Sequence, residues 1–169
     1  MIKPFNHKTP KIAESAWVSE RAYIIGDVEI GEDCCIWPGV VIRGDFAYIK
    51  IGNNTDIEDN SVLHVKVPMD IGENVVIGHN VVVHCRKIGN NTIIGNNATV
   101  LDEAEVGEKC VIAAGAVVTP GSIIPAESFV AGVPAQVKRK VNAEQADLVA
   151  EHYRYYTKEY KKLYKDWNI

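Results

Sequence analysis

The amino-acid sequence contains no apolar run close to the ~20 residues that a membrane-spanning helix needs. It also has no long basic run, and its formal net charge is -4 at pH 7. The first residues, MIKPFNHKTPKIAES, contain no apolar signal core. Because basic surfaces attract nucleic acids and anionic lipids, we expect no nucleic-acid partner and no membrane partner. A cytoplasmic location is the expectation that fits these absences.

Cysteine pairs of the CxxC type, which are common in zinc sites and redox motifs, are missing too. The four cysteines are Cys34, Cys35, Cys85 and Cys110. In a cytoplasmic chain they are expected to be reduced thiols. We interpret Cys34 and Cys110 as small core residues, and we expect Cys85 to fill space rather than to sense oxidation.

The sequence does contain a six-residue repeat, which starts at Ile12. The first position of each hexad is Ile, Val or Leu, and the fifth position is usually small or β-branched. Glycine often follows the first residue, which suits tight corners. Small interruptions occur after two hexads and one hexad is shortened. The first positions are Ile12, Val18, Ile24, Ile30, Ile36, Ile42, Ile51, Ile57, Leu63, Ile71, Ile77, Val83, Ile88, Ile94, Val100, Val106, Ile112, Val118, Ile124 and Val130.

A period of six fits neither an α-helix nor a simple β alternation, but it fits a triangular coil. Each hexad would supply one short strand and one corner, and three hexads would close a turn. The aliphatic residue then points into a narrow interior, and the coils stack through strand hydrogen bonds about 4.8 Å apart. The sequence therefore predicts an all-β solenoid, a left-handed parallel β-helix of hexapeptide repeats, over residues 1–141.

The repeat ends after Val130 in the segment AGVPAQVKR, and from about Asn142 the pattern becomes helical. Asn142 can cap such a helix, and Glu144 and Asp147 suit its first turns. A loose apolar stripe follows. We therefore predict a C-terminal α-helix over residues 142–169 that packs on the solenoid.

The repeat also predicts where two of the histidines lie. Arg43, His64 and His84 each follow a first-position residue on the same face of the prism, the third face counted from Ile12. Because second-position side chains point outward, these three residues should form a surface ladder with rungs about 5 Å apart.

His79 is placed differently, near a corner of the second face. Within one chain it is poorly placed to meet His64 and His84. A symmetric trimer, with the second face of one subunit against the third face of the next, would bring the three imidazoles together. Three neutral imidazoles with an open fourth position are the ligand set of a catalytic zinc site.

The run VVIRGDFAYIKIGNNTDIEDNSVLHV, followed by IGHNVVVHC, closely resembles the gamma-class carbonic anhydrases. The resemblance extends from about Ile12 to the C-terminal helix. It implies a homotrimer with interfacial metal sites, in which His64 and His84 come from one chain and His79 from its neighbour. It also implies reversible hydration of carbon dioxide to bicarbonate by metal-bound hydroxide. Zinc is the expected metal, with iron and cobalt as alternatives because all three accept imidazole.

The resemblance assigns further site residues. Arg43 and Asp45 match the pair that bridges subunits near the metal in that family, although a purely structural ion pair is an equal alternative. Where the family usually has glutamine, this chain has Glu58, which could hydrogen-bond metal-bound water, act as a base or alter metal affinity. The acidic loop for proton transfer is not matched, since Phe46 follows Asp45 and the segment after His64 is short.

Two other functions stay open at this point. The segment AGVPAQVKR is similar to the closing segment of hexapeptide-repeat acyltransferases, which use a histidine as general base beside an acyl-CoA donor. This chain lacks their long excursion loop, and its histidines suit metal ligands better. The second alternative is a metal-binding member of the family without hydration activity.

Overall fold

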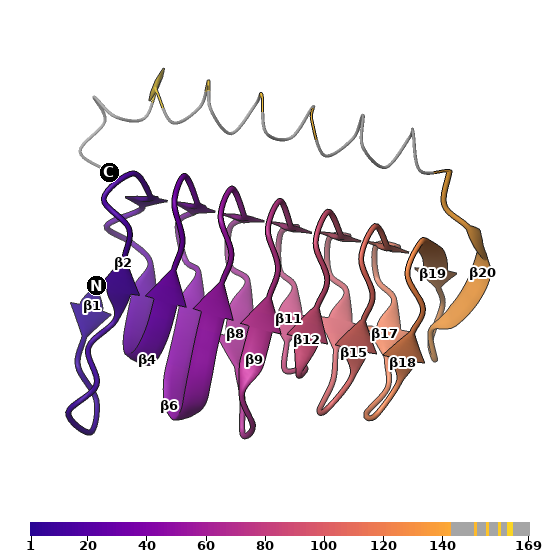
Figure 1. Cartoon of the computed structure of the whole chain (residues 1–169), viewed down its shortest axis with the longest axis horizontal. Helices are drawn as coiled ribbons and strands as arrows, with labels where there is room; N and C mark the ends of the chain where they lie inside the picture. The colour runs from indigo at the N-terminus through magenta and orange to yellow at the C-terminus, as the bar shows by residue number, and fades with distance from the viewer. Residues whose placement is uncertain (143–150, 152–154, 156–158, 160–161, 164–169) are drawn as a thin grey trace.

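The computed structural model describes residues 1–142 and five residues further on, namely Glu151, Tyr155, Glu159, Lys162 and Leu163. Residues 11–131 wind into triangular coils that stack along one axis, as Figure 1 shows. Each coil contributes short strands to three faces, and equivalent strands of successive coils pair in parallel. The predicted all-β parallel solenoid is therefore confirmed.

The first and third faces share one sheet. Its strands are β1 (Ile2–Lys3), β2 (Lys11–Ile12), β4 (Tyr23–Ile30), β6 (Val41–Ile51), β8 (Val62–His64), β9 (Met69–Ile71), β11 (Val82–Val83), β12 (Lys87–Ile88), β14 (Thr99–Val100), β15 (Glu105–Val106), β17 (Val117–Val118) and β18 (Ile123–Ile124). The two faces are joined because β4 and β6 continue around the corner between them.

The second face is a separate sheet. Its strands are β3 (Trp17–Val18), β5 (Cys35–Ile36), β7 (Asp56–Ile57), β10 (Val76–Ile77), β13 (Ile93–Ile94), β16 (Val111–Ile112), β19 (Ser128–Ala131) and β20 (Gln136–Lys140). The last strand, β20, turns back antiparallel to β19 at the end of the solenoid.

The first-position aliphatic residues fill the interior, as the repeat predicts. From Ile24 to Val130 all of them are buried, and only Ile12 and Val18, on the first coil, are half-buried. All four cysteines are buried and none forms a disulfide, and Cys34, Cys85 and Cys110 belong to this apolar interior. This continuous apolar column holds the coils in register and thereby fixes which outward side chains become neighbours.

The corners use asparagine more than the sequence suggested. Asn54, Asn80 and Asn97 take positive φ angles of 54°, 56° and 60°. Asparagine tolerates this left-handed region better than other residues with a side chain. Glycines that follow the aliphatic residue have another role. At Gly78 a Cβ atom would collide with Asn96 of the next coil, so the glycine permits close stacking of the coils.

The predicted C-terminal helix, residues 142–169, lies largely outside the described residues. Of the described residues there, Asn142 is not helical, and the five from Glu151 onward have helical backbone. The packing of this segment and the domain boundary at residue 141 stay predictions. Within the part of the chain that the structure describes, no helix is long and apolar enough to span a membrane.

Candidate metal centre

Arg43, His64 and His84 lie side by side on the third face, as predicted. Arg43 pairs in register with His64 between β6 and β8, and Leu63 pairs with Val83 between β8 and β11, which places His84 on the next rung. The ring centroids of the two histidines are 5.2 Å apart. Nε2 of His84 lies 3.3 Å from Nδ1 of His64. Two imidazole nitrogens on successive coils therefore face each other.

Carboxylates lie at both ends of this histidine pair. Asp45 Oδ1 is 2.9 Å from His64 Nε2, and Asp45 Oδ2 accepts a hydrogen bond of 2.7 Å from the Arg43 guanidinium. On the other side, Asp102 Oδ1 is 3.2 Å from His84 Nδ1. The five side chains form one row in the order Arg43, Asp45, His64, His84, Asp102. Arg43 and Asp45 are thus an ion pair within the chain, directly attached to a predicted ligand.

The charge of Asp45 is supported by its surroundings. Burial alone would raise the pKa of Asp45, but the hydrogen bond with His64 and the Arg43 guanidinium outweigh it and hold this pKa below its usual range. Asp45 is therefore a carboxylate at neutral pH and accepts the proton that His64 carries on Nε2. In the neutral imidazole the other nitrogen, Nδ1, then has a bare lone pair, and this is the atom that faces His84.

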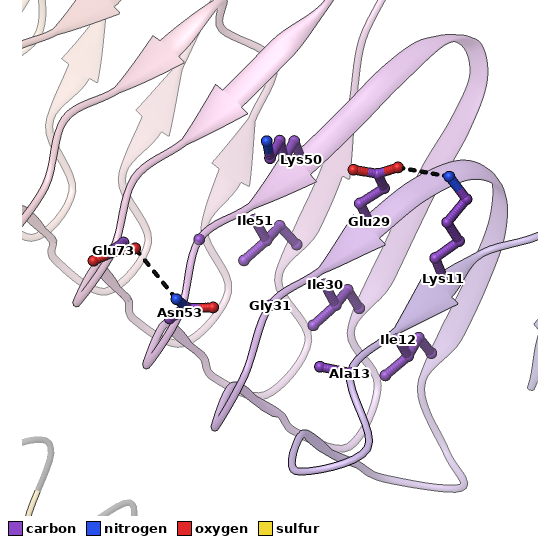
Figure 2. A pocket seen from close by; sticks show the side chains of 11 residues that line it. Lys11, Ile12, Ala13, Glu29, Ile30, Gly31, Lys50, Ile51, Asn53 and Glu73 are labelled. Atoms are coloured by element: carbon purple, nitrogen blue, oxygen red, sulfur yellow. Dashed lines mark hydrogen bonds and ion pairs between the residues drawn. The ribbon is translucent and has the colours of Figure 1, made fainter.

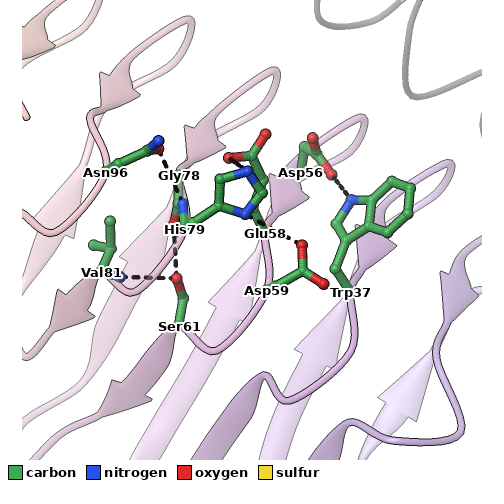
Figure 3. Close-up of polar contacts among 9 residues, drawn as sticks. All are labelled: Trp37, Asp56, Glu58, Asp59, Ser61, Gly78, His79, Val81 and Asn96. Atoms are coloured by element: carbon green, nitrogen blue, oxygen red, sulfur yellow. Dashed lines mark hydrogen bonds and ion pairs between the residues drawn. The ribbon is translucent and has the colours of Figure 1, made fainter.

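His79 lies apart from this row, on the second face just beyond β10. Its side chain is 46% exposed and lies between two carboxylates of the preceding coil. Nε2 is 3.3 Å from Glu58 Oε2, and Nδ1 is 3.2 Å from Asp59 Oδ2, as Figure 3 shows. Burial raises the pKa of Glu58, and the nearby charge of Asp59 adds to this effect, whereas His79 opposes it. Glu58 therefore accompanies His79 and not the pair on the third face.

One chain alone does not bring the three predicted ligands together. Among the described residues of a single chain, no three His, Cys, Asp or Glu side chains are grouped so that they could hold a metal ion. This agrees with the expectation that His79 is poorly placed to meet His64 and His84 within one chain.

Sequence reasoning missed Asp59 and Asp102. Asp59 directly follows Glu58 at a corner, and Asp102 follows the strand β14 that pairs with the strand before His84. A search for acidic residues within two positions of Val100, the next third-face first position after Val83, would have found Asp102. Its contact with His84 depends on how a side chain reaches toward a neighbouring coil, which the repeat alone does not specify.

A hollow of about 570 Å³ lies elsewhere, at the edge of the first face, and contains none of the predicted site residues (Figure 2). Its lining includes Lys11, Glu29 and Lys50, which pair in register on successive coils, and Lys50 pairs in turn with Asp70, so that the charges alternate. Lys11 and Glu29 form an exposed ion pair at 2.9 Å, which contributes little stability. The alternation of charge also avoids like charges on adjacent coils.

Comparison with known proteins agrees with this fold. The family described as "Bacterial transferase hexapeptide (six repeats)" matches residues 9–44 and 87–120. A solved hexapeptide transferase family protein from Anaplasma phagocytophilum is 35% identical, with a TM-score of 0.88, over 95% of this chain and 98% of that one. The chain therefore belongs to the hexapeptide-repeat family of left-handed β-helix proteins.

Within that family the chain is similar to gamma-class carbonic anhydrases, as the sequence indicated. A carbonic anhydrase of Geobacillus kaustophilus is 53% identical over 64 residues, which are 38% of this chain and 35% of that protein. The mitochondrial gamma carbonic anhydrase 1 of Arabidopsis thaliana is 44% identical over 78 residues, 41% of this chain and 28% of that protein. The matches thus span about a third of the length of these curated relatives.

Proposed function

We propose that this protein is a metal-dependent enzyme of the gamma carbonic anhydrase type, which interconverts carbon dioxide and bicarbonate. The proposed ligands are His64 and His84 of one chain and His79 of another, in a homotrimer. Zinc is the proposed metal. The observation that carries the proposal is the pair of facing imidazole nitrogens on the third face.

The distance between these nitrogens fits a bound ion. Two nitrogens that are each about 2.0–2.1 Å from a tetrahedral zinc ion would be roughly 3.3–3.4 Å apart. Nδ1 of His64 and Nε2 of His84 are 3.3 Å apart. The donor set is also suitable, because neutral imidazole binds zinc, iron and cobalt. The residues present therefore fit the metal that the family implies.

The surface around the pair supports a site shared between chains. The Phe46 side chain is 76% exposed, and its ring centroid lies 6.0 Å from that of His64. In the proposed trimer a second copy would cover this exposed ring. The half-exposed His79 on the second face is the side chain that the second copy would bring.

Each remaining side chain has a chemical role in this proposal. A bound zinc ion would supply a hydroxide nucleophile at neutral pH. Arg43 provides the positive charge that attracts bicarbonate, and Asp45 holds both Arg43 and His64 in place. Glu58 is largely buried beside His79, where its raised pKa suits it to accept and release a proton.

Metal content and hydration activity, measured together on anaerobically purified protein, test this proposal. We expect about one metal ion per subunit and acceleration of carbon dioxide hydration that disappears when a chelator removes the metal. Protein that never binds zinc, iron or cobalt would reject the metal site. Stoichiometric metal without hydration would identify a metal-binding family member without turnover.

An acyltransferase is the second candidate, because the matched family and the Anaplasma relative are both named as transferases. Between β2 and β20 the strands are joined by short turns such as residues 31–34, without the excursion loop that is typical of those enzymes. Calorimetry with acetyl-CoA distinguishes the two functions. Binding of acetyl-CoA that survives removal of the metal would favour the transferase.

A further inference from the structure

The contact between Asp102 and His84 has no assigned role. Asp102 lies in the turn after β14, on the coil that follows His84, and its Oδ1 atom is 3.2 Å from His84 Nδ1. His84 is half-buried on the rung beside His64. Asp102 thus stands on the far side of His84 from the point that the two imidazoles share.

The position of this carboxylate decides between the two neutral forms of His84. An ionised carboxylate only accepts hydrogen bonds. A bare lone pair on His84 Nδ1 would be repelled by the negative charge of Asp102. A protonated Nδ1 is attracted to that charge. Asp102 therefore favours the tautomer with the proton on Nδ1, which leaves the lone pair on Nε2, the atom that faces His64.

The other tautomer would close the site. With its proton on Nε2, His84 would donate a hydrogen bond to Nδ1 of His64 across the 3.3 Å that separates them. Protonation would remove the Nε2 lone pair of His84, and the hydrogen bond would occupy the Nδ1 lone pair of His64, so that neither atom could bind a cation. Asp45 fixes the tautomer of His64 in the same way from the opposite end of the row. Two carboxylates, one at each end, are needed to leave both inner nitrogens bare.

We propose that Asp102 is a positioning residue, which orients His84 so that its Nε2 lone pair points to the same place as Nδ1 of His64. This inference rests on the proposed metal site and adds a residue to it. Carboxylates that hold a metal-ligating histidine through its second nitrogen commonly raise metal affinity. Asp102 is expected to act in this way without touching metal or substrate.

The test is the substitution Asp102→Asn in the full chain, with zinc affinity measured by competition with a chelator. The amide has nearly the same shape, but its NH2 group can donate to Nδ1 and so favours the wrong tautomer. We expect zinc affinity to fall about 10- to 100-fold while the circular dichroism spectrum stays unchanged. Nitrogen NMR of His84 in the metal-free natural protein should show the proton on Nδ1. In the metal-free Asp102→Asn variant it should show the proton on Nε2.

Glu103→Gln is the matched control. It removes the same charge from the neighbouring position, but Glu103 pairs with Arg86 at 3.6 Å rather than with a histidine. An equal loss of affinity in both variants would show a general charge effect and overturn the inference. Asp102→Glu should recover part of the affinity if a carboxylate beside Nδ1 is what matters.

His84→Ala separates this inference from the proposed function. If His84→Ala loses zinc and Asp102→Asn binds it as tightly as the natural protein, the inference is wrong and the metal site stands. If His84→Ala itself keeps zinc, both the site and the inference are wrong.

Discussion

His64 and His79 lie on different faces of the solenoid, His64 at the end of β8 on the third face and His79 just after β10 on the second. Their separation leads to a prediction about mixed trimers. Trimers made only of His64→Ala chains or only of His79→Ala chains should bind no metal. When the two variants are mixed, some interfaces bring together a chain with intact His64 and His84 and a chain with intact His79.

Random mixing of equal amounts should restore about one quarter of the metal sites, because each site needs one particular chain on each side. Metal content of trimers that are unfolded and refolded together measures this fraction. Mixed trimers, verified by mass spectrometry, that bind no metal would contradict the shared site.

His84→Ala should abolish metal binding with little change in stability. His84 points outward from the apolar column, so its loss creates no large cavity. Metal analysis and a thermal unfolding curve provide the two measurements. His7→Ala removes an exposed histidine far along the sequence from the ladder and serves as the control that should keep its metal.

Glu58→Gln introduces the residue that the family usually has at this position. If Glu58 serves as a base, its amide should retain metal but lower the rate of carbon dioxide hydration about 100-fold or more. Metal content shows whether the variant retains its metal, and the rate constant at saturating carbon dioxide shows whether catalysis is lost. An unchanged rate would mean that Glu58 only holds His79 in place.

The sequence was sufficient to predict the register of the ladder but not the contacts made across it. Arg43, His64 and His84 each directly follow a buried first-position aliphatic residue. Counting hexads along the sequence was therefore enough to align them. The contacts of Asp45 and Asp102 could not be found in this way, since each side chain reaches a neighbouring coil and the repeat does not specify side-chain conformation.

The corner beside the ladder shows the same limit. The repeat is interrupted between the hexads that start at Ile42 and Ile51, and the structure shows that β6 continues through this interruption. This path requires Gly26 and Gly44, because a Cβ atom at Gly26, where φ is +84°, would collide with the carbonyl of Gly44. Such close approaches depend on two coils at once. Neither hexad reveals them alone.

The four cysteines are predicted to be unreactive in the folded protein. All are buried, and burial raises the pKa of Cys85 to about 12. Because the reactive form is the thiolate, Cys85 stays protonated at neutral pH and does not compete with His84 as a ligand. A thiol reagent at pH 8 should modify none of them until denaturant is added, and then all four. Rapid modification of Cys85 in the native state would contradict this.

Ile77→Asp is predicted to unfold the solenoid. The Ile77 side chain is fully buried in the apolar column and pairs on both sides, with Ile57 and Ile94. A carboxylate there has no partner and no access to water, so its burial should cost more than about 4 kcal/mol. Denaturant unfolding followed by circular dichroism measures the loss.

Val82→Asp is the matched control, because it adds the same charge at the last position of the same hexad, at a side chain that is 40% exposed. Its carboxylate can remain hydrated, and its effect on the free energy of unfolding should be within about 1 kcal/mol. Equal destabilisation by both substitutions would mean that the stability of the coil does not depend on the inward aliphatic residues. The register that aligns His64 with His84 would then need another physical cause.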